Sequence, residues 1–187
     1  MFSDVLYFVL NILFSLFGIA LIIRAWMYAI RLHPFNPYSQ AVLRATNWFV
    51  GPLRSVVKPS NRLDWPALIA CWLTALVYLL VTWVVFTGQL PSGEGMARSL
   101  VAAVLTMAKL AFNIVLWVTL IQAVLSWVNP MAPMMPLLQT LTAPLLDPIR
   151  RFMPNLGGLD LSPLVLLVLA QVAIMVLQRL AFSIFGV

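Results

Sequence analysis

Long apolar runs alternate with short polar stretches along the whole chain, and four of the runs are long enough to cross a bilayer. The first covers residues 5–23 without a charge and continues as a helical pattern to about residue 32. The other three cover about 66–88, 108–128 and 163–185. About 20 apolar residues cross a hydrocarbon core of about 30 Å, and lipid offers no partner to an unpaired backbone group. The pattern therefore predicts an all-α membrane protein with four transmembrane helices.

Composition and charge place this chain in a membrane and orient it there. It has 63% hydrophobic and 9% charged residues, whereas soluble domains carry about 25% charged residues. The net charge of +6 does not indicate nucleic acid, because the basic residues lie between the spans. Connections 24–65 and 129–162 hold eight of them, and the short connection 88–99 holds one. By the positive-inside rule, both basic connections face the cytoplasm of a bacterial inner membrane and both termini face the periplasm.

The second half of the chain repeats the first at a constant offset of 96 residues. This offset pairs seven residues with identical ones: Pro34/Pro130, Pro37/Pro133, Thr46/Thr142, Pro52/Pro148, Arg54/Arg150, Leu63/Leu159 and Asp64/Asp160. We therefore expect two repeats, 1–90 and 97–187, each with two spans around a basic, proline-rich segment. Because each repeat has an even number of spans, the repeats run parallel, unlike the inverted repeats of many carriers.

The basic segments are predicted to form helices that lie in the membrane interface. Residues 38–51 place apolar side chains on one helical face and polar ones on the other. The corresponding stretch MMPLLQTLTAPLL is more apolar, so it sits deeper or packs against protein. A second, short helix is expected to begin at Pro52 in one repeat and at Pro148 in the other. Asp147 would cap that helix and pair with Arg150 or Arg151.

The basic segments are also the candidate functional sites. We expect a docking surface for anionic lipid headgroups, or for a membrane or cytoplasmic protein, built from Arg54, Lys58, Asp147, Arg150, Arg151 and Asp160. The simpler interpretation is that the arginines only set topology and reach the headgroups. For Asp64 and Asp160, each just before a span, helix capping is favoured over catalysis.

Other chemistry-bearing residues are sparse. Cys71 is the only cysteine, and no metal, cofactor or catalytic motif is present, so neither an enzyme nor a bound cofactor is expected. Lys109 is expected at the outward end of the third span. Asn113 and Gln122 lie inside that span, where polar side chains hydrogen-bond across helices or, alternatively, line a conduction path.

The second repeat resembles the YggT family of small bacterial membrane proteins. The resemblance lies in an Asn-Pro, a Thr-x-Pro, a Pro-x-Arg-Arg and a proline followed by Gly-x-Asp-x-Ser-Pro. Here these are Asn129-Pro130, Thr142-Ala143-Pro144, Pro148-Ile149-Arg150-Arg151, Pro154, and Gly158, Asp160, Ser162 and Pro163. The first repeat fits more loosely, because Ser55 follows Arg54 where the motif has a second arginine.

The resemblance implies an organising role and no reaction. Family members are inner-membrane proteins, and some are associated with osmotic tolerance and potassium uptake. Others are linked to organelle division, nucleoid distribution, cytochrome-complex assembly or cell-division genes. We therefore expect a non-enzymatic scaffold or assembly factor, with potassium transport under osmotic stress as the alternative. The pairing of two units within one chain also leaves a homo-oligomer open.

Overall fold

The computed structural model describes residues 2–32, 36–152 and 160–185, and within these ranges the chain forms six helices and no strand. They are α1 (Phe2–Ala29), α2 (Pro37–Val56), α3 (Trp65–Thr87), α4 (Gly93–Val128), α5 (Met135–Phe152) and α6 (Ser162–Phe185). Helices α1, α3, α4 and α6 are long and apolar enough to cross a membrane, as predicted. Four residues used in the repeat and the motif lie outside the described ranges: Pro34, Pro154, Gly158 and Leu159.

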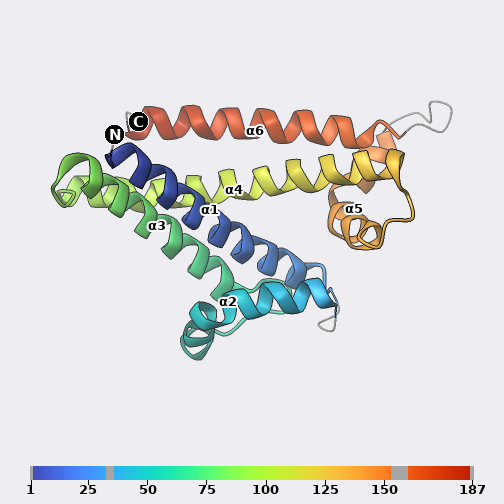
Figure 1. Ribbon diagram of the computed structural model, residues 1–187, viewed down its shortest axis with the longest axis horizontal. Coiled ribbons are helices and arrows are strands. Elements are labelled where there is room, and N and C mark those ends of the chain that lie inside the picture. The colour runs from blue at the N-terminus through green and yellow to red at the C-terminus, as the bar shows by residue number, and fades with distance from the viewer. Residues whose placement is uncertain (1, 33–35, 153–159, 186–187) are drawn as a thin grey trace.

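The four spans form two hairpins, α1 with α3 and α4 with α6 (Figure 1). Helix α2 lies between the spans of the first hairpin in sequence, and α5 between those of the second. Both chain termini and the α3–α4 connection gather at one end, while α2 and α5 lie away from it (Figure 1). The two repeats therefore run parallel, as the even number of spans requires.

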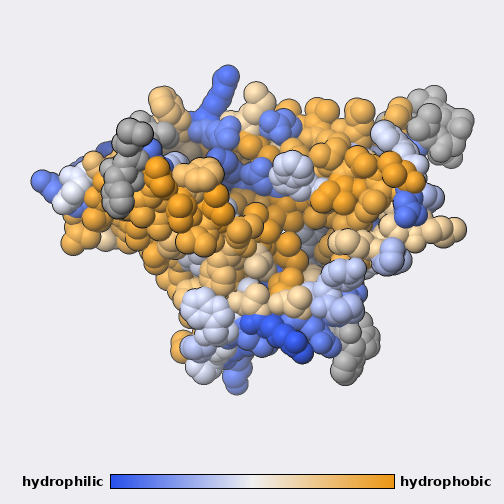
Figure 2. Space-filling model, viewed as in Figure 1, coloured by the Kyte–Doolittle hydropathy of each residue, from blue (hydrophilic) through white to orange (hydrophobic). Residues whose placement is uncertain are grey.

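Small residues allow the hairpins to approach each other closely. A β-carbon added at Gly18 of α1 would lie 2.9 Å from Leu110 Cδ1 of α4. Ala70 and Cys71 of α3 are fully buried beside them. Lipid is as apolar as the side chains, so close van der Waals packing drives association between membrane helices. The outer faces remain apolar, and hydrophobic side chains cover most of the molecule in Figure 2.

The first span ends at Ala29, three residues before the predicted end. Arg31 has a φ of 55°, in the left-handed region that glycine usually occupies at a helix end. Its N–H donates to the Tyr28 carbonyl at 3.1 Å, and the Leu32 N–H donates to the Met27 carbonyl at 2.9 Å. These two bonds form a Schellman motif. This helix end could not be predicted from the sequence, because arginine occupies the position where glycine usually marks the end of a helix.

The third span is much longer than predicted, because α4 begins at Gly93 and not near residue 108. No glycine or proline interrupts residues 96–128. Its 36 residues are about 54 Å long at the usual rise, well beyond the hydrocarbon thickness of about 30 Å. Lys109 is exposed and lies in the middle of this long helix, so its place at the outward end of the membrane-crossing part stays a prediction.

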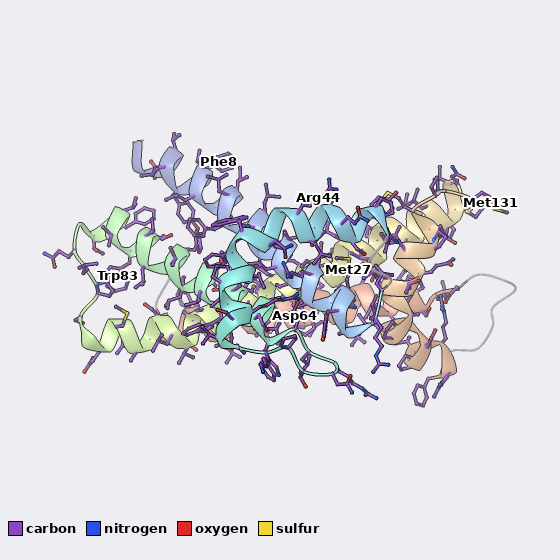
Figure 3. All side chains as sticks on the ribbon, turned by 90° about the horizontal axis from the view of Figure 1, so that it is seen from below. Phe8, Met27, Arg44, Asp64, Trp83 and Met131 are labelled. Atoms are coloured by element: carbon purple, nitrogen blue, oxygen red, sulfur yellow. The ribbon has the colours of Figure 1, made fainter. Side chains whose placement is uncertain are left out.

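The prediction of separate short helices at Pro52 and Pro148 was also wrong. Helix α2 continues through Pro52, and α5 continues through Pro144 and Pro148. A proline inside a helix removes one backbone hydrogen bond and crowds the preceding turn, which bends the helix without always ending it. Figure 3 shows that α2 changes direction before its end. Asp147 consequently lies inside α5 and caps no helix start.

Helices α2 and α5 bury equivalent positions against the spans, since Ser39, Thr46 and Val50 correspond at the offset of 96 to Met135, Thr142 and Leu146. In α2 the buried residues are Ser39, Thr46 and Val50, while Tyr38 and Trp48 of the predicted apolar face are exposed. That face is only partly turned away from the protein, because Phe49 packs against the buried core and the Trp48 ring centroid lies 5.4 Å from that of Phe17 in α1. In α5, the buried residues include Leu138, Leu141 and Leu146. Of the two alternatives for this segment, packing against protein is the one observed.

Candidate functional site

A buried ion-pair cluster joins α1, α2 and the start of α3. Arg54 Nη2 donates to Asp64 Oδ2 at 2.9 Å, and Arg24 Nε lies 3.5 Å from the same oxygen. Arg24 and Asp64 are almost fully buried, whereas the Arg54 side chain is 40% exposed. Asp64 lies beneath α2 in Figure 3. Its side chain makes no helix-capping bond, so the capping interpretation was wrong for this residue.

Thr46 completes this first ion-pair cluster, which we define as Arg24, Thr46, Arg54 and Asp64. Arg24 Nη1 donates to the Thr46 hydroxyl at 2.8 Å, and that hydroxyl donates to the Val42 carbonyl at 2.7 Å. A buried charge is tolerated only when other charges and hydrogen bonds offset its lost hydration. The cluster therefore fixes α2 against both spans of its hairpin.

The second repeat has a second ion-pair cluster at the equivalent place, defined as Asp147, Arg150, Asp160 and Ser162. Its three charged side chains are exposed, whereas Ser162 is buried. Arg150 Nη2 lies 2.8 Å from Asp160 Oδ2, and Arg150 Nη1 lies 3.3 Å from Asp147 Oδ1. Asp160 also accepts bonds from the Ser162 N–H at 2.9 Å and from the Ser162 hydroxyl at 2.5 Å. Here the aspartate does cap the following span. The predicted pair of Asp147 with Arg150 is confirmed.

The environment of Asp160 favours its ionised form. Burial on its own would raise the pKa of this carboxyl, but the Ser162 hydrogen bonds and the Arg150 guanidinium outweigh it and hold the pKa below the ordinary value. Each of these groups stabilises the carboxylate and not the neutral acid. The second ion-pair cluster is therefore intact near neutral pH.

Acid is expected to weaken the second ion-pair cluster. A depressed carboxyl pKa contributes stability that is fully present above the unfolded-state value of about 3.9 and is lost as pH falls through the lower folded-state pKa. Unfolding of the wild type in detergent, measured from pH 6 to pH 2, should thus show an acid-dependent loss that Asp160→Asn reduces. Parallel pH profiles for the two proteins would contradict the assignment.

The two repeats anchor their interfacial helices through equivalent threonines. Thr142 is fully buried, and its hydroxyl bonds the Leu138 carbonyl at 2.9 Å and the side chain of Gln122. The predicted role of Gln122 in bonding across helices is thereby confirmed. Asn113 behaves differently, because its amide donates to the Lys109 carbonyl of its own helix at 2.9 Å.

The family pattern of CCB3/YggT matches residues 3–85 and again residues 101–181. The chain belongs to the CCB3/YggT family. The YggT protein of Escherichia coli strain K12 is 32% identical to it, over 90% of this chain and 87% of that protein. A Vibrio alginolyticus protein is 34% identical over 89% of both chains, and a Pseudomonas aeruginosa protein is 31% identical over 93% and 89%. The names of these relatives state no activity, and no solved structure matches the chain.

Each CCB3/YggT match contains most of one hairpin together with its ion-pair cluster. Four of the six predicted site residues belong to these clusters: Arg54, Asp147, Arg150 and Asp160. Lys58 and Arg151 are exposed and have no ion pair within residues 2–32, 36–152 and 160–185. In the same ranges, no group of histidine, cysteine, aspartate or glutamate side chains is arranged to hold a metal ion.

Sequence reasoning missed Arg24, which it placed in the first cytoplasmic connection. The structure places it inside α1, fully covered by protein. A signal was available, since Arg24 follows 19 residues without a charge in one helical pattern. An arginine in that setting needs a carboxylate nearby. Asp64, forty residues later, is that partner.

Proposed function

We propose that the protein is a non-enzymatic scaffold of the bacterial inner membrane that organises or assembles partners on α2 and α5. The main support is that these two helices lie on the same side of the parallel repeats (Figure 1). Each is fixed to its hairpin by an arginine–aspartate pair. By the positive-inside rule, this side is the cytoplasmic one.

The ion-pair clusters give this surface a defined composition. Arg54 and Arg150 are paired within the clusters. Other basic side chains of this surface are exposed: Arg44, Lys58, Arg62 and Arg151. Trp48, Val56 and Phe152 are exposed apolar side chains of the same helices. Each basic residue near an anionic membrane surface contributes about 1 kcal/mol of attraction. The surface therefore suits headgroups and a partner that also lies at the membrane.

A non-enzymatic role agrees with how the acidic groups are used. Asp64 and Asp160 each face an arginine at hydrogen-bond distance, and Asp64 is buried. A general acid or base must instead reach a proton of its substrate. The geometry thus supports a structural function for both carboxylates.

Potassium transport under osmotic stress is the alternative function. Gln122 and Asn113 would be its polar path, but Gln122 bonds Thr142 and Asn113 bonds a carbonyl of its own helix. The Thr119 hydroxyl is buried without a hydrogen-bond partner in the described part of the chain, and it is the one observation that favours this alternative. Potassium flux in proteoliposomes that depends on Thr119 would support transport over scaffolding.

Site-specific crosslinking tests the scaffold. A photoreactive residue at position 56 or 152 should capture a membrane-associated protein in cells, because Val56 and Phe152 are exposed beside the basic residues. Lys58→Ala with Arg151→Ala should reduce the adduct about thirtyfold, the expected effect of losing about 1 kcal/mol at each of two bases. Membrane insertion should be unchanged, because neither side chain belongs to an ion-pair cluster.

Two controls define what the adduct means. A photoreactive residue at Leu90, which is 81% exposed at the other end of the molecule, should not give the same product. Arg98→Ala removes an exposed base from α4 and should leave the adduct unchanged. Adducts that form equally from position 90, or that persist without Lys58 and Arg151, would refute the scaffold.

A further inference from the structure

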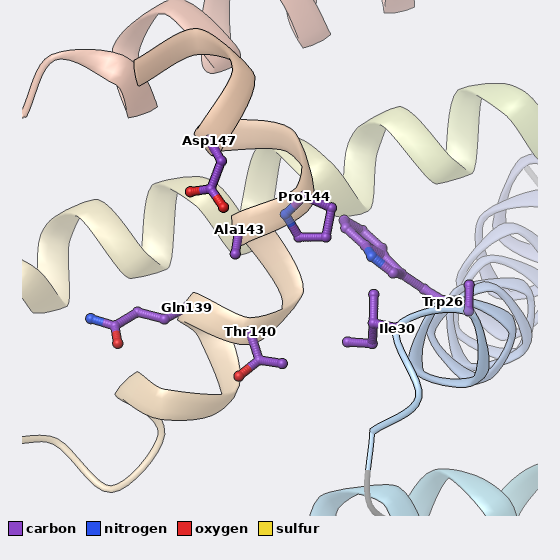
Figure 4. A pocket seen from close by; sticks show the side chains of 8 residues that line it. Trp26, Ile30, Gln139, Thr140, Ala143, Pro144 and Asp147 are labelled. Carbon is purple, nitrogen blue, oxygen red and sulfur yellow. The ribbon is translucent and has the colours of Figure 1, made fainter. Parts of the chain in front are cut away.

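A groove of about 790 Å³ separates the C-terminal end of α1 from α5 (Figure 4). Trp26 and Ile30 of the first repeat line one side, and Ala143, Pro144 and Asp147 of the second repeat line the other. The volume lies within the range of about 300–1,000 Å³ typical of sites for small ligands. The groove is therefore a candidate ligand site between the two repeats.

The walls of the groove suit an acyl chain. Trp26 extends from α1 toward Pro144, and Ile30 lies beside it (Figure 4). Both α1 and α5 belong to the membrane, one as a span and the other as an interfacial helix, so lipid is the solvent at the mouth of the groove. Tryptophan is enriched at the level of the headgroups, where an apolar ring meets polar surroundings.

Asp147 gives the groove a negative charge. Its side chain is 57% exposed, and its only ion pair within the described ranges is the 3.3 Å contact with Arg150. Arg150 lies closer to Asp160, at 2.8 Å, so two carboxylates share one guanidinium. The cluster thus carries one more negative than positive charge, and a cation with an apolar body complements it.

We propose that the groove binds one phospholipid with a primary ammonium headgroup, that is, a phosphatidylethanolamine. Its ammonium donates a charge-assisted hydrogen bond to Asp147, and one acyl chain lies along Trp26 and Pro144. A choline headgroup has no N–H to donate, and a glycerol headgroup has no positive charge, so both bind less well. The proposal rests on the proposed function only in placing α5 at the headgroup level.

Quenching of Trp26 fluorescence tests this lipid site. The purified protein is reconstituted in phosphatidylcholine bilayers that contain equal fractions of brominated phosphatidylethanolamine, phosphatidylcholine or phosphatidylglycerol. The Trp26 signal is the difference between the wild type and Trp26→Phe. We expect phosphatidylethanolamine to quench it most, with a preference on the order of tenfold, which is typical of a hydrogen bond to a charged group.

Three variants test separately the charge of Asp147, the shape of the groove and the general effect of removing a carboxylate. Asp147→Asn should abolish the headgroup preference, and Ala143→Leu should reduce quenching by all three lipids because its side chain fills the groove. Glu94→Gln, which removes an exposed carboxylate from α4, should leave the preference unchanged. Retained thermal stability of each variant in detergent shows that the fold is intact.

Other results would overturn the proposal. Equal quenching by the three lipids would show that Asp147 selects no headgroup, and stronger quenching by phosphatidylglycerol would assign selection to the arginines of α5. A Trp26 signal that none of the three lipids quenches would show that no acyl chain lies in the groove. Because no partner is present in this assay, its outcome is independent of the crosslinking test.

Discussion

Replacing Asp64 by alanine is expected to lower the free energy of unfolding by about 3–5 kcal/mol, the cost of breaking a buried ion pair. The substitution leaves Arg24 fully buried with no carboxylate, because Arg54 is the other charge beside it and has the same sign. The unfolding of the purified protein in mixed micelles, followed by circular dichroism across a denaturant series, measures this loss.

The second repeat supplies a matched control. Asp160→Ala removes the equivalent carboxylate, but Asp160 and Arg150 are 45% and 43% exposed, so water replaces the lost partner. The expected loss is about 1–2 kcal/mol, because an exposed ion pair contributes little and the bonds from Ser162 contribute about as much as a helix cap. Equal losses for Asp64→Ala and Asp160→Ala would contradict the difference in burial between the repeats.

Removing both buried partners should partly restore stability. The double variant Arg24→Met with Asp64→Leu leaves no unpaired charge in the core, so it should be more stable than Asp64→Leu alone. Arg54 can turn to water, since its side chain is already partly exposed. A double variant that is less stable than Asp64→Leu would show that Arg24 stabilises the fold through some other contact.

The two ion-pair clusters differ in charge at two equivalent positions. At the offset of 96, Arg24 corresponds to Leu120 and Asp147 corresponds to Gly51. The first cluster therefore holds two arginines and one aspartate, and the second holds one arginine and two aspartates. The first ion-pair cluster is thus buried and carries a net positive charge. The charged side chains of the second are exposed and carry a net negative charge beside the groove.

The number of spans, their parallel repeats and the basic helices between the spans could be predicted from the sequence. Burial in lipid requires uninterrupted apolar runs, and a repeat leaves its proline and arginine pattern at a fixed spacing. Both signals are local or periodic. The ends of the helices were harder to predict from the sequence, because Arg31 adopts a glycine-like conformation and three prolines stay within helices.

The sequence indicates that Arg24 needs a carboxylate, but which residues form the buried cluster could not be predicted, because they are far apart along the chain. Arg24 and Asp64 are brought together by the packing of α1 against α3, which no periodicity specifies. The groove is hidden for the same reason, since Trp26 and Asp147 belong to different repeats. What sequence analysis did identify was the chemical type of these residues, including five of the eight members of the two clusters as candidate site or capping residues.

The equivalent threonines Thr46 and Thr142 are expected to differ in their contribution to stability. Thr46→Val keeps the shape but leaves Arg24 Nη1 without its hydrogen bond, and Arg24 Nη2 already has none in the described part of the chain. Thr142→Val leaves only the neutral amide of Gln122 without its partner. An unpaired buried group costs about 1–3 kcal/mol, with charged groups at or above the upper end.

We therefore expect Thr46→Val to lower the free energy of unfolding by about 3 kcal/mol and Thr142→Val by about 1–2 kcal/mol. Hydrogen exchange should quicken in α2 for the first variant and in α5 for the second, because each hydroxyl anchors only its own interfacial helix. Thr46→Ser and Thr142→Ser retain the hydroxyl and should stay close to the wild type. If both valine variants matched the wild type, the hydroxyls would not anchor these helices, and apolar packing alone would fix α2 and α5 to their hairpins.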